Sequence, residues 1–285
     1  MVARPEQDIS TERHGMRNSP QASLVAASVF MALIAVSLAF ATYNRNSTWK
    51  DPVSMWADVV AKSPHKARPH YNYATVLAGE MRLEQALAEN LRALEVNPYY
   101  AQVYFNIGAI FQVWGRTEEA IDKYLIANAL KPDIVEAHNN LGYAYYTLGL
   151  EDKALEEYAA AIEVKPSHAK AYINIGKVYR GRGLLEEAAS EYKKALSYKP
   201  DYAEAHLMLA EARLDQGRLA EAAEGFSNAV NIKPAYAEAY NGIGRLLEAQ
   251  GRYDQAAKAY QTALQIRPGY EDAEKNLIRL TSGDR

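Results

Sequence analysis

The chain has 285 residues, of which 49% are hydrophobic and 24% are charged, and its formal net charge is −3. This is the composition of a folded protein, and the near-neutral charge balance argues against a dedicated nucleic-acid binder, which is usually basic. Because the sequence contains no cysteine, disulfides, thiolate nucleophiles, cysteine-based zinc sites and a bacterial lipoprotein anchor are excluded.

The first strongly patterned segment is an uncharged, mostly apolar run, ASLVAASVFMALIAVSLAFATY, over residues 22–43. A helix of this length is about 33 Å long, which is enough to cross the hydrocarbon core of a bilayer. We therefore expect a transmembrane helix, acting as a signal anchor, over residues 21–43, after a flexible cytoplasmic leader over residues 1–20. Two alternatives stay open: a buried core helix, and a signal peptide with Ala39-Phe40-Ala41 as its cleavage site.

The basic residues around the apolar run indicate its orientation. Arg4, Arg13 and Arg17 precede the run, whereas Arg45 and Lys50 follow it. By the positive-inside rule, this bias favours a cytoplasmic N-terminus. The C-terminal bulk of the chain would then lie outside. We therefore expect a single-pass protein of the bacterial inner membrane, with its main domain on the periplasmic side.

An internal repeat with an interval of 34 residues runs through the rest of the chain. Alanine, glycine and aromatic columns, such as those that contain Ala86, Gly149 and Tyr124, stay in phase with a column of prolines. The prolines are Pro64, Pro98, Pro132, Pro166, Pro200, Pro234 and Pro268. Apolar residues recur at i, i+3, i+4 and i+7 within each unit, a spacing that predicts helices, here two antiparallel helices per unit.

The interval and the columns resemble the tetratricopeptide repeat (TPR), a helix–turn–helix unit of the same length. The resemblance implies an all-α fold, a right-handed TPR solenoid over residues 67–270. Its six repeats would be residues 67–100, 101–134, 135–168, 169–202, 203–236 and 237–270. A single repeat cannot bury its own apolar face, so the ends must be capped. We expect a juxtamembrane segment and N-capping helix over residues 44–66, and a C-terminal capping helix and tail over residues 271–285.

The third repeat illustrates the expected helix pair. Its first helix should span about residues 136–148 and its second about residues 152–164. Gly149 ends the first helix and Pro166 prevents continuation of the second. The small columns lie where helices cross closely, so we expect Gly142 to be kept by packing rather than by helix propensity.

Proteins of this family bind peptides or protein segments in a concave groove that the first helix of each repeat lines. The resemblance therefore implies a groove for a partner protein or an extended peptide in this chain too. The residues that the family register places in the groove are Tyr71, Asn72, Phe105, Asn106, Asn139, Asn140, Tyr143, Tyr146, Asn174, Lys177 and Arg180.

One groove position carries asparagine in four successive repeats, and the next two repeats have Met208 and Gly242 there. The asparagines are Asn72, Asn106, Asn140 and Asn174. This row is similar to the asparagine ladder in the superhelical domain of O-linked N-acetylglucosamine transferase, which implies amides that hold a peptide backbone. The alternative is that asparagine merely suits this helix position in stacking.

Motifs for catalysis are absent from the sequence: it contains no P-loop, no G-x-S-x-G and no H-E-x-x-H. His70, His138 and His206 alternate with tyrosines in one column of the repeat, so we interpret them as packing residues rather than metal ligands. We expect no enzymatic activity, no cofactor, no bound metal and no nucleic-acid partner.

Residues 42–77, which join the apolar run to the first repeat, resemble the junction in polytopic membrane O-glycosyltransferases that end in TPRs. This chain has one apolar span and no acidic catalytic loop of that kind, so the resemblance implies topology but not catalysis. Three functions follow. The first is a membrane-anchored scaffold that binds a partner in its groove and organises a membrane or periplasmic complex. The others are an accessory module of a membrane glycosyltransferase or polysaccharide-export system, and a structural subunit of a large membrane assembly.

Overall fold

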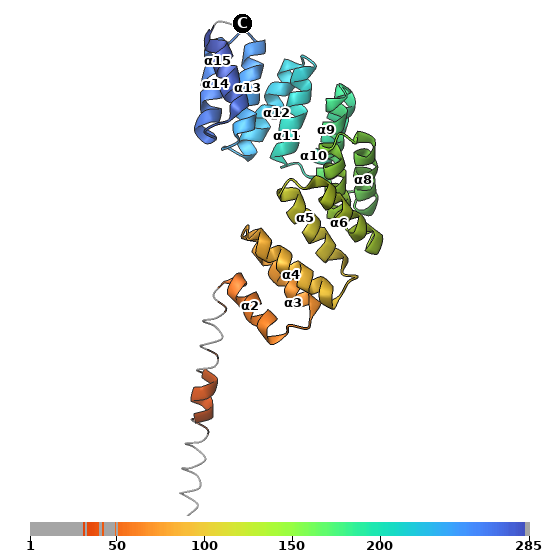
Figure 1. Ribbon diagram of the computed structural model, residues 1–285. Coiled ribbons are helices and arrows are strands. Elements are labelled where there is room, and N and C mark those ends of the chain that lie inside the picture. Colours follow the sequence, from red (N-terminus) through yellow and green to blue (C-terminus); the bar gives the residue numbers. More distant parts are fainter. Residues whose placement is uncertain (1–30, 32, 40–41, 43–48, 50, 283–285) are drawn as a thin grey trace, which may run out of the picture. The chain divides into compact units, whose positions relative to one another are not determined.

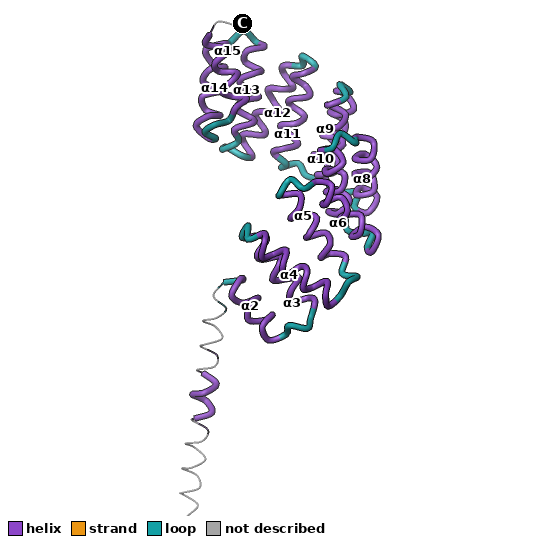
Figure 2. Tube along the Cα trace, in the orientation of Figure 1, coloured by secondary structure: helices purple, strands orange, loops and turns teal. Residues whose placement is uncertain are grey.

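The computed structural model describes residues 31, 33–39, 42, 49 and 51–282 (Figure 1). The chain divides into two compact units, Met1–Ser63 and Pro64–Arg285, and each is described by itself. Helices joined by short loops make up the described part of the chain, and no strand occurs in that part (Figure 2). The predicted all-α class is therefore confirmed.

In the first unit, Met31, residues 33–39 and Thr42 are helical. Within the ranges that the structure describes, no helix is long and apolar enough to cross a membrane. The predicted leader over residues 1–20, and most of the predicted membrane segment over residues 21–43, lie outside those ranges. The membrane anchor therefore remains a prediction from the sequence.

The first unit also contains α2 (Pro52–Lys62), within the segment where a helix was expected before the repeats. Asp51 caps its N-terminus, because the carboxylate accepts a hydrogen bond from the Ser54 amide at 2.9 Å. Pro52 stands in the first turn, where a missing amide donor costs nothing. Trp49 Nε1 donates a hydrogen bond to the Asp58 carboxylate at 3.2 Å, which joins Trp49 to the helix.

The second unit is a row of helix pairs, in which a first helix of 13 residues precedes a second helix of 14 residues. The pairs are α3 (Ala67–Gly79) with α4 (Leu83–Val96), α5 (Ala101–Val113) with α6 (Thr117–Leu130), α7 (Val135–Thr147) with α8 (Glu151–Val164), α9 (Ala169–Gly181) with α10 (Leu185–Tyr198), α11 (Ala203–Asp215) with α12 (Leu219–Ile232), and α13 (Ala237–Ala249) with α14 (Tyr253–Ile266). One more helix, α15 (Glu271–Ser282), follows the last pair. The helices α7 and α8 each begin one residue earlier than the sequence predicted.

The turn between the two helices of a pair explains the glycine column. Gly149 has a φ of 74°, in the left-handed region that glycine enters without strain. The next amide, of Leu150, donates to the Tyr145 carbonyl at 2.9 Å and closes the end of α7. In the first repeat, Met81 takes this position with a φ of 57°, which costs a residue with a side chain about 1–2 kcal/mol.

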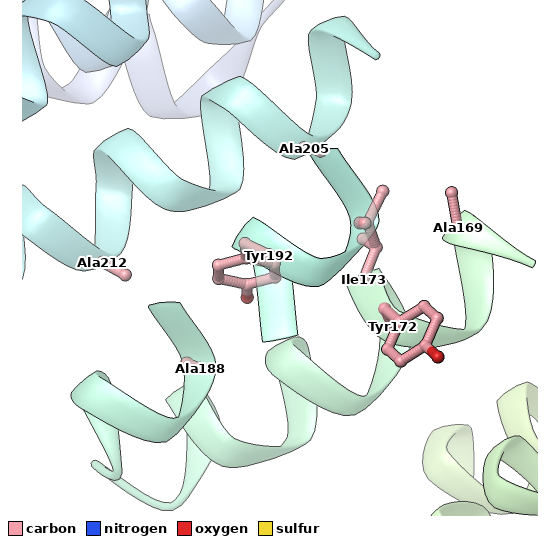
Figure 3. Close-up of a cluster of buried hydrophobic side chains, with 8 residues drawn as sticks. Ala169, Tyr172, Ile173, Ala188, Tyr192, Ala205 and Ala212 are labelled. Carbon is pink, nitrogen blue, oxygen red and sulfur yellow. The ribbon is translucent and has the colours of Figure 1, made fainter. Parts of the chain in front are cut away.

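The core of the second unit runs along the row of pairs instead of gathering at one centre. Figure 3 shows one cluster, in which Tyr192 of α10 lies with Ile173 of α9 and with Ala205 and Ala212 of α11. Tyr192 and Ile173 are completely buried. Each pair thus buries its apolar face against the first helix of the next pair, as the stacking argument predicted.

The histidine and tyrosine column ties the first helices α3, α5, α7, α9 and α11 to the loops before them. His70 Nε2 lies 2.9 Å from the Pro64 carbonyl, which can only accept a hydrogen bond, and Tyr104 donates its hydroxyl to the Pro98 carbonyl at 3.1 Å. His70 is buried, and its Nδ1 is 2.6 Å from the Glu89 carboxylate. The histidine therefore has a packing role, as predicted. Among the residues that the structure describes, no group of acidic and histidine side chains has the arrangement of a metal site.

The last helix, α15, covers the end of the row. Its Ala273 and Leu280 are buried against α13 and α14, and Leu277 packs beside them. Ile278, which follows Leu277 in the chain, is 58% exposed. Successive helical residues are about 100° apart around the axis, so Ile278 points away from the face that Leu277 occupies.

Candidate partner-binding groove

The first helices of the pairs form the inner face of the second unit. Neighbouring first helices, such as α7 and α9 or α9 and α11, contact one another, whereas each second helix packs mainly between two first helices. A row of helices that approach more closely on one side curves toward that side. The side chains that α5, α7, α9 and α11 project between them therefore line a groove, which contains two hollows.

The larger hollow has a volume of about 600 Å³ and is called the amide hollow here. Its lining residues come from four successive first helices: Ala109, Gln112, Val113, Asn139, Asn140, Tyr143, Lys170, Asn174, Lys177 and Glu204. Several residues that the sequence placed in the groove therefore do meet around one cavity. Asn139, Asn140 and Asn174 contribute amides to it, and Tyr143 contributes an aromatic side chain that is 48% exposed.

The second hollow has a volume of about 470 Å³ and is called the ionic hollow here. It shares Lys177 with the amide hollow, so the two hollows are adjacent. Its lining residues are Tyr146, Lys177, Arg180, Gly181, Met208 and Asp215. The predicted groove residues Tyr146, Lys177 and Arg180 are therefore brought together here.

The asparagine row is largely engaged within the protein. Asn174 Nδ2 donates to Asn139 Oδ1 at 3.0 Å, and these two side chains are only 5% and 2% exposed. Asn140 Oδ1 accepts a hydrogen bond from Asn139 Nδ2 at 3.3 Å, and Asn106 Nδ2 donates to Thr75 Oγ1 at 3.1 Å. The contacts of Asn174 and Asn106 link one repeat to the next, so they support the stacking interpretation of the row over amides left free for a peptide backbone.

Two of the predicted groove aromatics belong to the packing. The ring of Tyr71 lies 5.1 Å from that of Tyr100, and the ring of Phe105 lies 5.9 Å from that of Tyr124. Both Tyr71 and Phe105 pack against the buried cluster of the second repeat. Of the predicted groove aromatics, Tyr143 is therefore the most exposed. The predicted groove residue Asn72 is half-buried on α3.

Ion pairs cross the groove from one first helix to the next, and the sequence reading missed most of their members. Lys177 Nζ lies 2.6 Å from Glu204, and Arg180 lies 2.7 Å from Asp215. Asp215 also pairs with Arg245 at 3.1 Å. The partners are 27 to 35 residues apart. The sequence contains a signal for these pairs: residues of opposite charge lie about one repeat apart on successive first helices.

The same network also contains Glu211, which pairs with Arg180 at 2.5 Å. Burial raises the pKa of the Glu211 carboxyl, and the Arg180 guanidinium opposes that rise. Burial also works to lower the pKa of Arg180, but the Glu211 and Asp215 carboxylates hold it above the usual value. Each charge in this part of the groove is thus balanced by a neighbour inside the protein.

Models of known families match segments of the second unit. A family model described as "TPR repeat" matches residues 115–149, 176–217 and 210–251. Two models described as "Tetratricopeptide repeat" match residues 237–270 and residues 135–168. No curated protein matches the chain.

Several solved structures are similar to this chain. The APC/C hetero-tetramer Cut9–Hcn1 aligns with a TM-score of 0.72 at 16% identity over 83% of this chain and 47% of that one, so the present chain spans about half of its length. PilF of Pseudomonas aeruginosa aligns with a TM-score of 0.64 at 18% identity over 73% of this chain and 95% of PilF. YrrB, titled a TPR protein with an unusual peptide-binding site, aligns with a TM-score of 0.50 at 24% identity over 65% of this chain and 95% of YrrB. At these identities the likeness establishes the fold alone.

Proposed function

Because this chain belongs to the tetratricopeptide repeat family, we propose that it is a non-enzymatic scaffold whose groove binds a segment of a partner protein. The observation that carries this proposal is the amide hollow on the inner face. Its walls expose Tyr143 and Val113, which are 48% and 59% accessible. Open aromatic and aliphatic surface in a concave, polar-rimmed site favours recognition of another chain.

The test is site-specific photocrosslinking in the host cell. A benzophenone amino acid in place of Tyr143 keeps an aromatic side chain at the wall of the amide hollow. The matched control places it at Leu125, which is 44% exposed on α6, a second helix of the row. We expect a discrete crosslinked protein from position 143 and none of that size from position 125. Equal labelling from both positions, or none from position 143, would overturn the groove as the binding site.

The scaffold, in this proposal, is held at a membrane by residues 21–43. The uncharged run in that segment supports the anchor, and the arginines before it support a cytoplasmic N-terminus with the repeats on the periplasmic side of a bacterial inner membrane. We expect the protein to stay in the membrane fraction after alkaline extraction. The repeats should be digested by protease in spheroplasts but not in intact cells.

The signal-peptide alternative gives a different result in the same preparation. N-terminal sequencing of the membrane-extracted protein should begin before residue 21 if the anchor is retained. A start directly after Ala41, at the end of the A-x-A site, would instead establish cleavage and a periplasmic protein without this anchor.

The resemblance of residues 42–77 to glycosyltransferase junctions supports a more specific variant, in which the partner is a polytopic membrane enzyme. Under this variant, the protein crosslinked from position 143 is itself an integral membrane enzyme, and loss of the chain alters a glycan. A structural subunit of a large assembly would instead self-associate. In that case the purified chain should elute as an oligomer in gel filtration.

A further inference from the structure

A third hollow, of about 600 Å³, is lined by α8, α9 and α10 and is called the outer hollow here. The first helix among them, α9, contributes Tyr172, Ile175 and Tyr179. These residues lie on the side of α9 opposite to Asn174 and Lys177 of the amide hollow, because successive helical residues are about 100° apart around the axis. The outer hollow is therefore a separate surface from the groove.

The outer hollow has an aromatic and aliphatic lining. The rings of Tyr172 and Tyr198 stack with their centroids 5.7 Å apart and their planes 20° apart. Tyr172 is buried, whereas Tyr198 is 49% exposed, so the second ring offers open aromatic surface to a ligand. Ile162 of α8 and Ile175 of α9 add aliphatic surface. Such a lining can hold the aliphatic stem of a long side chain, and the face of an aromatic ring attracts a cation.

One carboxylate of the outer hollow lacks the histidine partner that its counterparts have in other repeats. Glu191 of α10 is the twenty-third residue of the fourth repeat, and the same position carries Glu89 in the first repeat and Glu157 in the third. Each of those two carboxylates bonds to a histidine at the fourth position, as Glu89 does to His70 at 2.6 Å. In the fourth repeat Tyr172 replaces the histidine, and it donates its hydroxyl to a backbone carbonyl of the loop before α9 instead.

Glu191 is left with a single, exposed partner. Lys194 Nζ donates to Glu191 Oε1 at 2.7 Å, and no other ion pair joins Glu191 to the residues that the structure describes. The Glu191 side chain is 13% exposed, whereas that of Lys194 is 54% exposed. An exposed lysine is a weakly held partner, and a largely buried carboxylate is stabilised by a further cation. Glu163 of α8, which is exposed and forms no ion pair within the described ranges, adds a second carboxylate to the lining.

We propose that the outer hollow is a second docking site, which binds a basic segment of a partner protein through an arginine side chain. The guanidinium pairs with Glu191 and Glu163 and displaces Lys194 into solvent, while its aliphatic stem lies against Ile162 and the ring of Tyr198. Arginine fits better than lysine, because its planar group stacks on an aromatic ring and donates two hydrogen bonds to one carboxylate. An acidic segment would be repelled by the two carboxylates.

The experiment selects binders from a displayed library of random peptides on the immobilised full chain in detergent micelles. Peptides that also bind the Glu191→Gln variant are removed, which leaves those that need this carboxylate. We expect arginine to be enriched in the remaining peptides relative to the library, and their affinity to fall as the salt concentration is raised. Glu163→Gln and Tyr198→Ala, which play no part in the selection, should each weaken the remaining peptides by about threefold or more.

Lys194→Ala is the decisive variant, because it should act in the opposite direction. Loss of the lysine frees Glu191 and should strengthen binding of the remaining peptides by about threefold, whereas damage to the fold would only weaken it. The matched control is Glu95→Gln. It removes the same charge at the position of the first repeat that corresponds to Glu163, and it should leave the affinity within about twofold.

The proposal is overturned if no peptide remains after the removal step, or if arginine is not enriched in those that remain. Weaker or unchanged binding to Lys194→Ala, or equal effects of Glu163→Gln and Glu95→Gln, would also overturn it. None of these outcomes alters the crosslink from position 143, so the proposed function stands or fails separately.

Discussion

At the scale of single residues, Gly142 shows why the small column exists. A β-carbon at this position would stand 2.7 Å from Cε1 of Tyr158 and 3.1 Å from the carbonyl oxygen of Ala154. The ring of Tyr158 is almost completely buried and cannot swing away. The sequence predicted a close helix crossing here, and the structure adds that an aromatic ring of the same repeat fills the space.

Replacing Gly142 with alanine should therefore destabilise the protein by about 1–2 kcal/mol, because overpacking outweighs the gain in helix propensity. Gly181 is the matched control. It is also helical, at the end of α9, but a β-carbon there meets nothing within 4 Å. Gly181→Ala should be neutral or stabilising by up to about 1 kcal/mol. Chemical denaturation of both variants checks this, and equal effects at the two positions would refute the packing account.

At the scale of elements, the first helix pair departs from the others. Four of the later pairs combine glycine on the first helix with tyrosine on the second, as in Gly108 with Tyr124, and α11 and α12 combine Ala210 with Phe226. In contrast, α3 and α4 combine Ala74 with Asn90. Asn90 is fully buried, and neither its Oδ1 nor its Nδ2 has a hydrogen-bond partner in the protein. The larger alanine and the smaller asparagine thus compensate in volume but leave a polar group unsatisfied.

This compensation predicts coupling between the two positions. Asn90→Tyr alone should destabilise the protein, because the new ring meets the β-carbon of Ala74. Adding Ala74→Gly should restore the pairing of the other repeats and make the double variant more stable than the wild type by about 1 kcal/mol or more. Thermal unfolding of the four proteins gives the coupling energy. Additive effects of the two substitutions would contradict the proposed contact.

At the scale of the whole repeat unit, stability comes from contacts between neighbouring repeats. The last pair depends on α15, because Tyr260 and Ala263 are buried in clusters that Leu280 and Ala273 complete. In such an array the terminal unit opens first when its neighbour is lost.

Deleting residues 271–285 should therefore expose the outer face of the last pair. We expect faster hydrogen exchange in α13 and α14, a smaller effect in α11 and α12, and little change in α5 to α8. Removing only residues 283–285 keeps α15 and serves as the control. An equal rise in exchange along the row would show that the unit unfolds as one cooperative body instead.

The sequence by itself determined the helix pairs, the turns and the packing columns, and it gave the boundaries of α7 and α8 to within about a residue. These features depend on the helix propensity of each segment and on the 34-residue repeat interval, and both can be obtained from the sequence alone. The helix-ending role of Gly149 and the packing role of His70 were predicted on the same grounds.

Only the tertiary structure decided how side chains from different repeats meet. It pairs Asn174 with Asn139 and Arg180 with Asp215. It also places the ring of Phe226 where a β-carbon of Gly242 would stand, so that this glycine, which interrupts the asparagine row, serves packing. The physical reason is that such contacts depend on the rotation and the spacing between stacked repeats. The combined packing of many side chains sets both quantities, and no single interval in the sequence encodes them.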